Sequence, residues 1–583
     1  MRRGIPVSPG VAVAPVHRLD ERLSPSAGGR LDDTAIAREE AHFERACGAA
    51  ADELDAVADR VRTEVGPDEA GIFRAHRQLL RDSAREAPLV AKVKAIIRQK
   101  RIDASSALSG ALDEYASRFA KVPDPYLRER LSDVKDVVGR VQAHLVGADA
   151  RGEPTKWDGP VILVAAEILP SQAVMFEHIP VAGIVTEAGG TTGHAAILAR
   201  SLGIPAVSGI DGLLDRVRSG DLLIVDGREG VVLLNPGAEV EAAYRKMQRE
   251  YVDLRDRLIE NADRPAITGD GTAVALLANV NGPADAVTAV RTGAGGVGLY
   301  RTEYLFLTHA SVPTEDEQLA AYRHVIESSP NRLVTIRTLD VGGDKQVPFL
   351  ASQREANPFM GWRSVRMTNA YPELFQTQLR AILRAGAAGR IRVMFPMVST
   401  LEEVRQLKRL VAETRRKLGV NHDTPFGVMI EVPAAALCIA DILDEVDFVS
   451  IGSNDLIQYV MAADRDNPKV AHLCDPFNPA IFRLLNGVIT ACVGRHKPVT
   501  LCGEMAAQPR CFLPLLGMGL RRFSMSPAFV PTIKELACCV TLDHAREVSA
   551  AVLRLRTVAD VRDYLTKELA TVCPNVSQLD TAE

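Results

Sequence analysis

The sequence predicts a multidomain protein of α and α/β class whose C-terminal part is a (β/α)8 TIM barrel. Three observations lead to this prediction. The chain has 583 residues, enough for roughly three to five domains. Early in the chain, the spacing of apolar residues changes from helical to strand-like. After residue 263, a strand–helix unit recurs eight times, which favours a closed barrel over a doubly wound open sheet.

Composition and charge exclude several classes of protein. Hydrophobic residues make up 47% and charged residues 25% of the chain, as in globular proteins. A net charge of −5 without a strongly basic domain argues against nucleic-acid binding. The apolar runs are too short for membrane insertion, and the N-terminal stretch lacks the apolar core of a secretory signal. Nine cysteines without a CxxC motif or zinc spacing predict reduced thiols in the cytoplasm.

Helical periodicity predicts a four-helix bundle in the first part of the chain. From Asp33, apolar residues follow one another at seven-, four- and three-residue spacings, which places them on one face of a helix. Breaks containing Gly or Pro separate this helix from the next ones. The further helices are predicted near residues 68–83, 87–119 and 126–146.

Strand-like periodicity begins at Pro160 and predicts a compact β/α domain, in which short apolar strands alternate with short helices. Residues 4–16 predict more short strands around a turn, too few to fold alone. A 4-3 apolar stripe over residues 239–261 then predicts one long helix ending at Asn261. The expected domains are 1–30 with 147–236 (β/α), 31–146 (helical), 237–262 (linker helix) and 263–583 (barrel).

A glycine-rich turn places His194 at the start of a predicted helix. The segment GGTTGHAAILAR, residues 189–200, has glycines for a tight turn and threonines that can cap the helix. Free backbone N–H groups and the positive end of the helix dipole favour a phosphoryl group beside the imidazole. His194 is therefore a candidate nucleophile that carries phosphate, and a histidine in an ordinary βα turn is the alternative.

Polar side chains gather at the C-terminal ends of the predicted barrel strands, where barrel enzymes have their active sites. Arginines, carboxylates, an amide and a thiol meet there, which predicts an anionic ligand and a divalent metal. The strand ends carry Asn279, Arg301, Arg337, Met397, Glu431, Asn454, Asp455, Cys502 and Ser524, and the loops beyond carry Lys345, Arg363 and Arg465.

Five of these side chains have an alternative, structural role. Arg301 and Arg337 can bind phosphate or carboxylate oxygens, or form ion pairs with Glu303 and Asp340 respectively. Glu431 and Asp455 end consecutive strands, and their carboxylates can share Mg²⁺ or hydrogen-bond to nearby arginines. Cys502, at the end of the seventh strand, can donate a proton through its thiol, or it can be a buried structural cysteine.

Several motifs resemble the phosphoenolpyruvate-utilising phosphotransferases, and within them the enzyme I family of the bacterial phosphoenolpyruvate:sugar phosphotransferase systems. The resemblance runs essentially end to end, from GIPVSPGVAVAP to FSMSP. The long motifs that carry it are GGTTGHAAILAR, GVGLYRTEYLF, IRTLDVGGDK, NPFMGWRSVR, MIEVPAA, SIGSNDLIQY, ADRDN and LCGEMA.

This resemblance implies a role for each candidate residue. His194 would be phosphorylated, Glu431 and Asp455 would bind Mg²⁺, and Cys502 would donate a proton. Phosphoenolpyruvate would lie against Arg301, Arg337, Lys345, Arg363, Asn454, Asp455 and Arg465. The resemblance also implies a swivelling phosphohistidine domain, a helical domain that docks the acceptor protein HPr, and a homodimer through the barrel.

The expected reaction moves a phosphoryl group from phosphoenolpyruvate to His194 and then to a histidine of HPr, with release of pyruvate. His194 and the barrel lie in different predicted domains, so we expect swivelling about residues 262–266. Gly193 and Ala195 are closer to pyruvate phosphate dikinase and phosphoenolpyruvate synthase, so an enzyme of that kind is one alternative. The other is a non-catalytic regulator that binds phosphoenolpyruvate or HPr.

Overall fold

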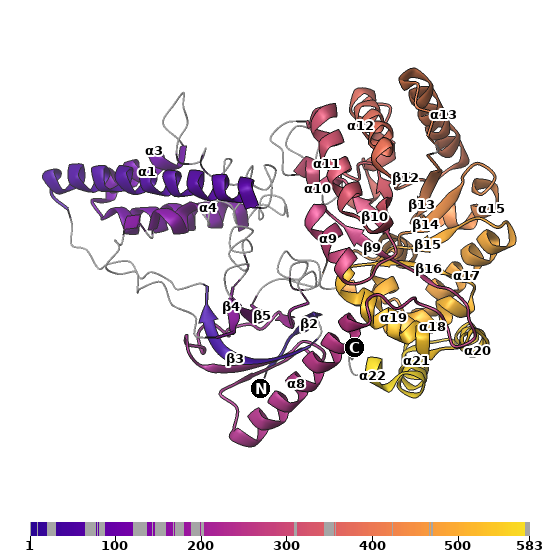
Figure 1. Ribbon diagram of the computed structural model, residues 1–583. Helices are drawn as coiled ribbons and strands as arrows, with labels where there is room; N and C mark the ends of the chain where they lie inside the picture. The colour runs from indigo at the N-terminus through magenta and orange to yellow at the C-terminus, as the bar shows by residue number, and fades with distance from the viewer. Residues whose placement is uncertain are drawn as a thin grey trace.

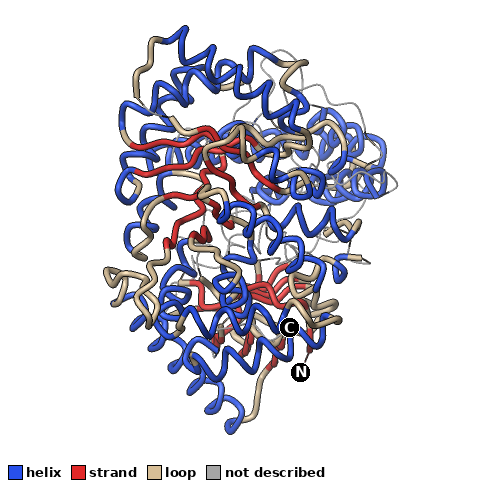
Figure 2. The backbone as a smooth tube through the Cα atoms, turned by 90° about the vertical axis from the view of Figure 1, so that its right-hand side faces the viewer, coloured by secondary structure: helices blue, strands red, loops and turns tan. Residues whose placement is uncertain are grey.

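The computed structural model of the chain is shown as a ribbon in Figure 1 and as a backbone tube in Figure 2. A barrel surrounded by helices forms one side of the molecule in Figure 1, and a sheet and a group of long helices form the other. The structure describes residues 2–8, 10–19, 31–64, 77, 80, 88–120, 137–142, 144–145, 159–166, 168, 180–187, 199, 203–307, 312–342, 355, 357–422, 424–465, 467 and 470–577.

The C-terminal part is a closed barrel of eight parallel strands, as the repeated strand–helix units predict. Each strand pairs with the next along the chain, and β16 pairs with β9, which closes the ring and rules out the open-sheet alternative. The strands are β9 (Ala275–Val280), β10 (Val297–Arg301), β11 (Leu333–Arg337), β12 (Arg390–Phe395), β13 (Phe426–Ile430), β14 (Phe448–Ile451), β15 (Val499–Leu501) and β16 (Arg522–Met525).

Helices cover the outside of the barrel, and one large apolar core lies between them and the strands. Inside the barrel, Leu299, Met394, Met429, Phe448 and Cys502 form a separate packed layer, so the barrel is filled rather than hollow. The helices are α9 (Pro283–Arg291), α10 (Glu303–Leu307), α11 (Glu315–Ser328), α12 (Pro372–Ala385), α13 (Leu401–Leu418), α14 (Pro433–Leu437), α15 (Ile439–Ile442), α16 (Ser453–Met461), α17 (Pro479–Gly494), α18 (Pro509–Gly517), α19 (Val530–Cys539), α20 (Leu542–Val552), α21 (Val558–Val572) and α22 (Pro574–Ser577).

Strands from both sides of the helical segment combine in one eight-stranded sheet. In the middle of this sheet, β3 pairs in parallel with β4 and antiparallel with β7. The strand order is β1-β8-β7-β3-β4-β5-β6-β2. The strands are β1 (Arg2–Arg3), β2 (Ile5–Ser8), β3 (Val11–Arg18), β4 (Val161–Ala165), β5 (Val181–Thr186), β6 (Ala206–Ser208), β7 (Leu222–Asp226) and β8 (Val231–Leu234).

The expected alternation of strands and short helices is wrong at the end of this sheet. Residues 209–220, between β6 and β7, form turns, and β7 and β8 form an antiparallel hairpin. Gly230, at the end of the hairpin turn, has a φ of +63°, which suits glycine. The Asn235 side chain also accepts a hydrogen bond from the Leu222 N–H across the base of the hairpin, at 3.0 Å.

The helical segment contains α1 (Asp33–Glu64), α3 (Pro88–Lys100) and α4 (Ala104–Ala120). The single helix expected over 87–119 is therefore two helices, because Arg101 adopts a left-handed φ of 55° and Asp103 accepts a hydrogen bond from the Ser106 N–H. Residues 137–142 are helical, within the expected segment 126–146. Most of the expected helix 68–83 lies outside the described residues.

The linker helix α8 (Ala238–Glu260) ends at its cap Asn261, as predicted. Tyr244 and Met247 pack against Val11, Val13 and Ile224 of the sheet. The following residue, Ala262, accepts a hydrogen bond from Lys534 of α19, which contacts α8. Within the described residues, none of the helices has the length and apolar character to span a membrane.

Candidate functional site

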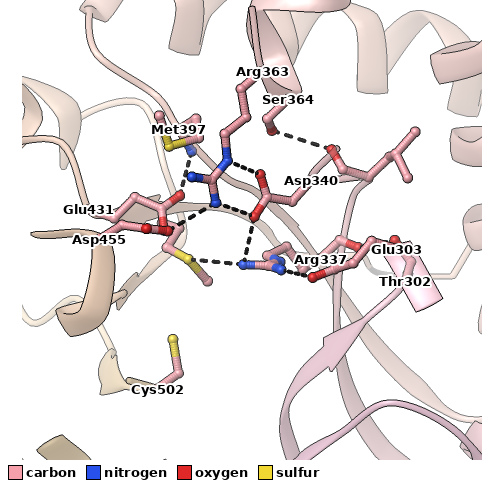
Figure 3. Close-up of polar contacts among 12 residues, drawn as sticks. Thr302, Glu303, Arg337, Asp340, Arg363, Ser364, Met397, Glu431, Asp455 and Cys502 are labelled. Atoms are coloured by element: carbon pink, nitrogen blue, oxygen red, sulfur yellow. Dashed lines mark hydrogen bonds and ion pairs between the residues drawn. The ribbon is translucent and has the colours of Figure 1, made fainter. Parts of the chain in front are cut away.

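The candidate site lies at the C-terminal ends of the barrel strands, where buried arginines and carboxylates form a connected cluster (Figure 3). Arg337 at the end of β11, Arg363 in the long connection from β11 to α12, Glu431 directly after β13 and Asp455 at the start of α16 lie at one end of the ring. The structure brings together five residues that the sequence analysis selected, namely Arg337, Arg363, Glu431, Asp455 and Cys502.

Arg337 ends β11 and is held between two carboxylates. Its Nη2 donates a hydrogen bond to Glu303, and its Nη1 lies 3.3 Å from Asp340 Oδ2. Burial would lower the pKa of the Arg337 guanidinium, but Glu303 and Asp340 raise it above its ordinary value. Arg337 therefore stays charged in a buried position. The expected alternative pair of Arg301 with Glu303 is wrong, since Glu303 pairs with Arg337.

Arg363 connects Asp340 to Asp455 across the barrel mouth, that is, the end of the barrel where the strands have their C-termini. Its Nε and Nη2 donate to the two oxygens of Asp340 at 2.8 and 2.9 Å, and Nη2 also donates to Asp455 Oδ2 at 3.0 Å. The side chain is only 1% exposed. Among the described residues, its buried Nη1 has no hydrogen-bond partner, so this donor remains available for an anionic ligand.

Glu431 follows β13 and lies beside Asp455 in the cluster (Figure 3). Its Oε1 accepts a hydrogen bond of 2.6 Å from the Met397 N–H. Met397 has a φ of 58°, a strained backbone conformation for a side chain of this size. Burial and the neighbouring carboxylates Asp455 and Asp340 raise the pKa of Glu431 to about 8, although Arg337 and Arg363 oppose the shift.

Glu431 and Asp455 have the chemistry that a divalent cation needs. Besides burial, the negative charges of Asp455 and Asp340 raise the pKa of Glu431, so these acids repel one another. A cation would remove the remaining repulsion, and carboxylate oxygens with phosphate and water are the ligands that Mg²⁺ prefers. Gly452 leaves room there, because a Cβ at this position would lie 2.7 Å from Glu431 Oε2. Glu431 and Asp455 are thus the residues that would hold the ion.

Cys502 lies directly after β15, at the boundary between the polar cluster and the apolar layer inside the barrel. Its thiol donates to the Ile451 carbonyl at 3.3 Å, and its sulfur accepts from Ser450 Oγ at 3.1 Å. Burial raises the pKa of Cys502 to about 11, while the bond from Ser450 opposes this shift. The thiol therefore carries its proton at neutral pH and can act as an acid.

The other expected ligands lie at the edge of the cluster or outside the described residues. Arg465 Nη1 is 3.8 Å from Asp455 Oδ1, and the Asn454 side chain accepts a hydrogen bond from the Glu504 N–H at 2.8 Å. Arg301 is half-buried at the end of β10 and has no ion-pair partner among the described residues. His194 and Lys345 lie outside the described part of the chain.

Sequence reasoning missed the residues that connect the cluster. Asp340 contacts both Arg337 and Arg363, although the sequence suggests it only as a structural partner of Arg337. The feature of the sequence that could have indicated this role is the position of Asp340, three residues after Arg337 at the end of a strand. Tyr459 donates to the Phe359 carbonyl at 2.5 Å and so ties α16 to the segment before Arg363. No local pattern in the sequence marks Tyr459 or Ser450.

Taken together, the mouth offers fixed guanidinium groups, two acids suited to a cation, and a protonated thiol. Such a site can bind a small molecule with several negative charges, offset charge that develops during its reaction, and supply one proton.

The chain matches the PEP-utilising enzyme family in three parts: the N-terminal part at residues 3–130, the mobile domain at 157–230 and the PEP-binding domain at 255–541. The site described above lies in the last of these. The three matched parts together extend over most of the chain.

Curated relatives match nearly the whole chain. Phosphoenolpyruvate-protein phosphotransferases from Bacillus sp. (strain S) and Geobacillus stearothermophilus are each 38% identical over 570 residues, which is 97% of this chain and 97% of theirs. The protein of the same name from Staphylococcus carnosus is 38% identical over 97% of this chain and 98% of its own length. With identity at this level over nearly the full length, the chain belongs to the PEP-utilising enzyme family, in the group of the phosphoenolpyruvate-protein phosphotransferases.

Proposed function

We propose that this chain transfers the phosphoryl group of phosphoenolpyruvate to His194 and then to a histidine of HPr, as the first enzyme of a sugar phosphotransferase system. One observation carries the proposal. A buried cluster of arginines and carboxylates with an adjacent thiol stands at the mouth of a barrel that matches a PEP-binding domain. This combination suits a triply charged donor whose leaving group must gain a proton.

The substrate would lie against the guanidinium groups of the mouth. Arg301 and the free Nη1 of Arg363 have hydrogen-bond capacity to offer it, and Arg337 adds a fixed positive charge. Asn454, Asp455, Arg465 and Lys345 would complete the pocket. Because these groups are already held by the fold, little reorganisation is needed when the phosphate binds.

Glu431 and Asp455 would hold Mg²⁺. When bound, the ion supplies positive charge to the phosphate oxygens and removes the repulsion between the two acids. The role of the protein here is to keep both carboxylates in one place: Met397 N–H binds Glu431 and Arg363 binds Asp455.

His194 would attack the phosphorus through Nε2, so that an N–P bond forms while the P–O bond to the enol oxygen breaks. The leaving group is the enolate of pyruvate, and its methylene carbon takes the proton of Cys502, which gives pyruvate and a thiolate. The Ser450 hydroxyl, already bonded to the sulfur, stabilises that thiolate until it regains a proton from water.

The proposal also includes partners and a location. HPr would dock on the helical segment, two copies of the chain would associate through the barrel, and the reaction would take place in the cytoplasm. The resemblance of the sequence to the enzyme I family supports these statements. The nine cysteines, all free thiols, fit a reducing compartment.

Release of pyruvate tests the proposed function. The full chain with phosphoenolpyruvate, Mg²⁺ and excess HPr should release about one equivalent of pyruvate per HPr, and without HPr it should release about one equivalent per subunit. ATP in place of phosphoenolpyruvate should label neither the chain nor HPr, which separates it from a dikinase or synthase. A chain that binds phosphoenolpyruvate without releasing pyruvate would instead be a non-catalytic regulator.

A further inference from the structure

We infer that Gln378 is a positioning residue for the phosphoenolpyruvate-binding arginines, an inference that rests on the proposed function. Gln378 lies in the middle of α12, outside the barrel, and is 1% exposed. Its side-chain amide bonds to the loops that end β10 and β11. The strand ends and the residues directly after them carry Arg301, Glu303, Arg337 and Asp340, which together form one half of the mouth.

The amide of Gln378 connects the two loops directly. Its Nε2 donates to Thr302 Oγ1 at 3.0 Å, and its Oε1 accepts from the Leu339 N–H at 2.8 Å. The Thr302 hydroxyl in turn donates to the Arg337 carbonyl at 2.9 Å. Thr302 lies between Arg301 and Glu303 in the chain, so this short network acts next to both arginines.

The orientation of the amide follows from its partners. The Leu339 N–H requires an acceptor, and Thr302 has given its proton to the Arg337 carbonyl, so its oxygen requires a donor. The second N–H of Gln378 donates to the Tyr322 hydroxyl at 3.1 Å, and Tyr322 donates to Gln318. All three main hydrogen-bonding positions of the amide are therefore used, which holds the side chain in one position.

An uncharged residue suits this place behind the mouth. Arg337, Glu303 and Asp340 already form buried ion pairs, and a charged side chain at position 378 would disturb their balance. A neutral amide fixes the backbone on both sides of Arg337 without adding charge. The forks of the arginines must match the oxygens of the substrate closely, so a small shift of either loop weakens binding.

Replacement of Gln378 by methionine tests the inference. The variant Gln378→Met keeps the length of the side chain and removes both links to the loops. Without these links, Arg301 and Arg337 are held less firmly in position. KM for phosphoenolpyruvate should therefore rise about tenfold, with a smaller change in kcat. Isothermal titration of phosphoenolpyruvate with Mg²⁺, in full chains that carry His194→Ala and so cannot be phosphorylated, should show a parallel loss of affinity.

Tyr322→Phe is the matched control. It removes a hydrogen bond from the same amide and a second one to Gln318, but leaves the links to Thr302 and Leu339. If Gln378 merely stabilises the fold, both variants should lower the thermal midpoint of unfolding similarly, with KM unchanged within about twofold. That result would overturn the inference.

Thr302, which accepts a hydrogen bond from Gln378, provides a second test that does not require the Gln378→Met variant to fold. Thr302→Val should raise KM as Gln378→Met does, Thr302→Ser should restore it, and the double variant should be no worse than either single one because they break one network. Additive losses would contradict the inference. If instead the unmodified chain neither binds phosphoenolpyruvate nor releases pyruvate, the proposed function fails, independently of Gln378.

Discussion

At the scale of single residues, the protonation of Glu431 links metal binding to pH. Burial and neighbouring carboxylates raise its pKa to about 8 in the folded chain, far above its value in an unfolded one. Between about pH 4.3 and this value, the folded chain holds a proton that the unfolded chain has lost. This residue therefore makes the free energy of unfolding fall as pH rises through that window, in the absence of Mg²⁺.

Two measurements follow from this raised pKa. Without metal, Glu431→Gln should flatten the decline of the free energy of unfolding, measured with urea between about pH 6 and pH 8.5. Mg²⁺ added to the unmodified chain near neutral pH should release protons into a weakly buffered solution, and Glu431→Gln should release fewer. Equal proton release from both proteins would show that Glu431 is already ionised.

The Ser450 hydroxyl should matter for the protonation step rather than for substrate binding. Ser450→Ala removes its bond to the Cys502 sulfur, which is worth about 1 kcal/mol, so pyruvate formation should slow roughly fivefold. Cys502→Ala should slow it far more, and both variants should bind phosphoenolpyruvate as the unmodified chain does. Stopped-flow detection of pyruvate measures both rates. Turnover by Cys502→Ala at the unmodified rate would remove the thiol from the mechanism.

Which residues meet at the mouth could be predicted from the sequence, because buried parallel strands have recognisable apolar patterns and their last residues share one end of the barrel. The partner of each residue could not. Glu303 bonds to Arg337 rather than to its chain neighbour Arg301, and this depends on loop geometry. Gln378 escaped notice because one buried amide in an amphipathic helix carries no signal of its own.

At the scale of elements, the barrel follows from its pattern, while two local features do not. The break between α3 and α4 has neither Gly nor Pro and depends on Arg101 taking a left-handed conformation, which sequence rules disfavour. Residues 209–220 form turns where the alternation of strands and helices predicts a helix, and β7 then pairs with β8 as an antiparallel hairpin. Tertiary pairing of this kind lies beyond the reach of local periodicity.

Lys534 of α19 attaches the end of the linker helix to the barrel. It is buried, and its ammonium donates to the carbonyls of Ala262 and, at 2.9 Å, of Gly293. Lys534→Met leaves both carbonyls without this donor and should lower the free energy of unfolding by about 2 kcal/mol, measured with urea. Lys246→Met, on the exposed side of α8, is the control and should change it by less than about 0.5 kcal/mol. Equal effects would show that the attachment adds no stability.

At the scale of the whole molecule, the proposed mechanism requires movement between the part that carries His194 and the barrel. The linker helix α8 packs on the sheet through Tyr244 and Met247 and is tied to the barrel just after its end. A pivot near residues 262–266 stays a prediction. The N-terminal strand β3 belongs to the eight-stranded sheet because it pairs with β4 and β7. The sequence predicts this shared domain, but it does not show the pairing.

Small-angle X-ray scattering of the full chain should detect this movement. Phosphoenolpyruvate with Mg²⁺ should change the distribution of interatomic distances, because the phosphorylated domain must leave or approach the barrel. Arg301→Met, which should lose affinity for the substrate without disturbing a buried ion pair, should give the same curve with and without these additions. Identical curves for the unmodified chain in both conditions would argue against a large swivelling motion.

The position of the transferred phosphate is the most direct test of the proposed mechanism. The full chain is incubated briefly with phosphoenolpyruvate carrying labelled phosphate and Mg²⁺, digested near neutral pH, and its labelled peptides are sequenced by mass spectrometry. The proposed mechanism predicts one acid-labile label, on His194, which His194→Ala abolishes while phosphoenolpyruvate still binds. A label that persists in His194→Ala, or that maps to another residue, would contradict it.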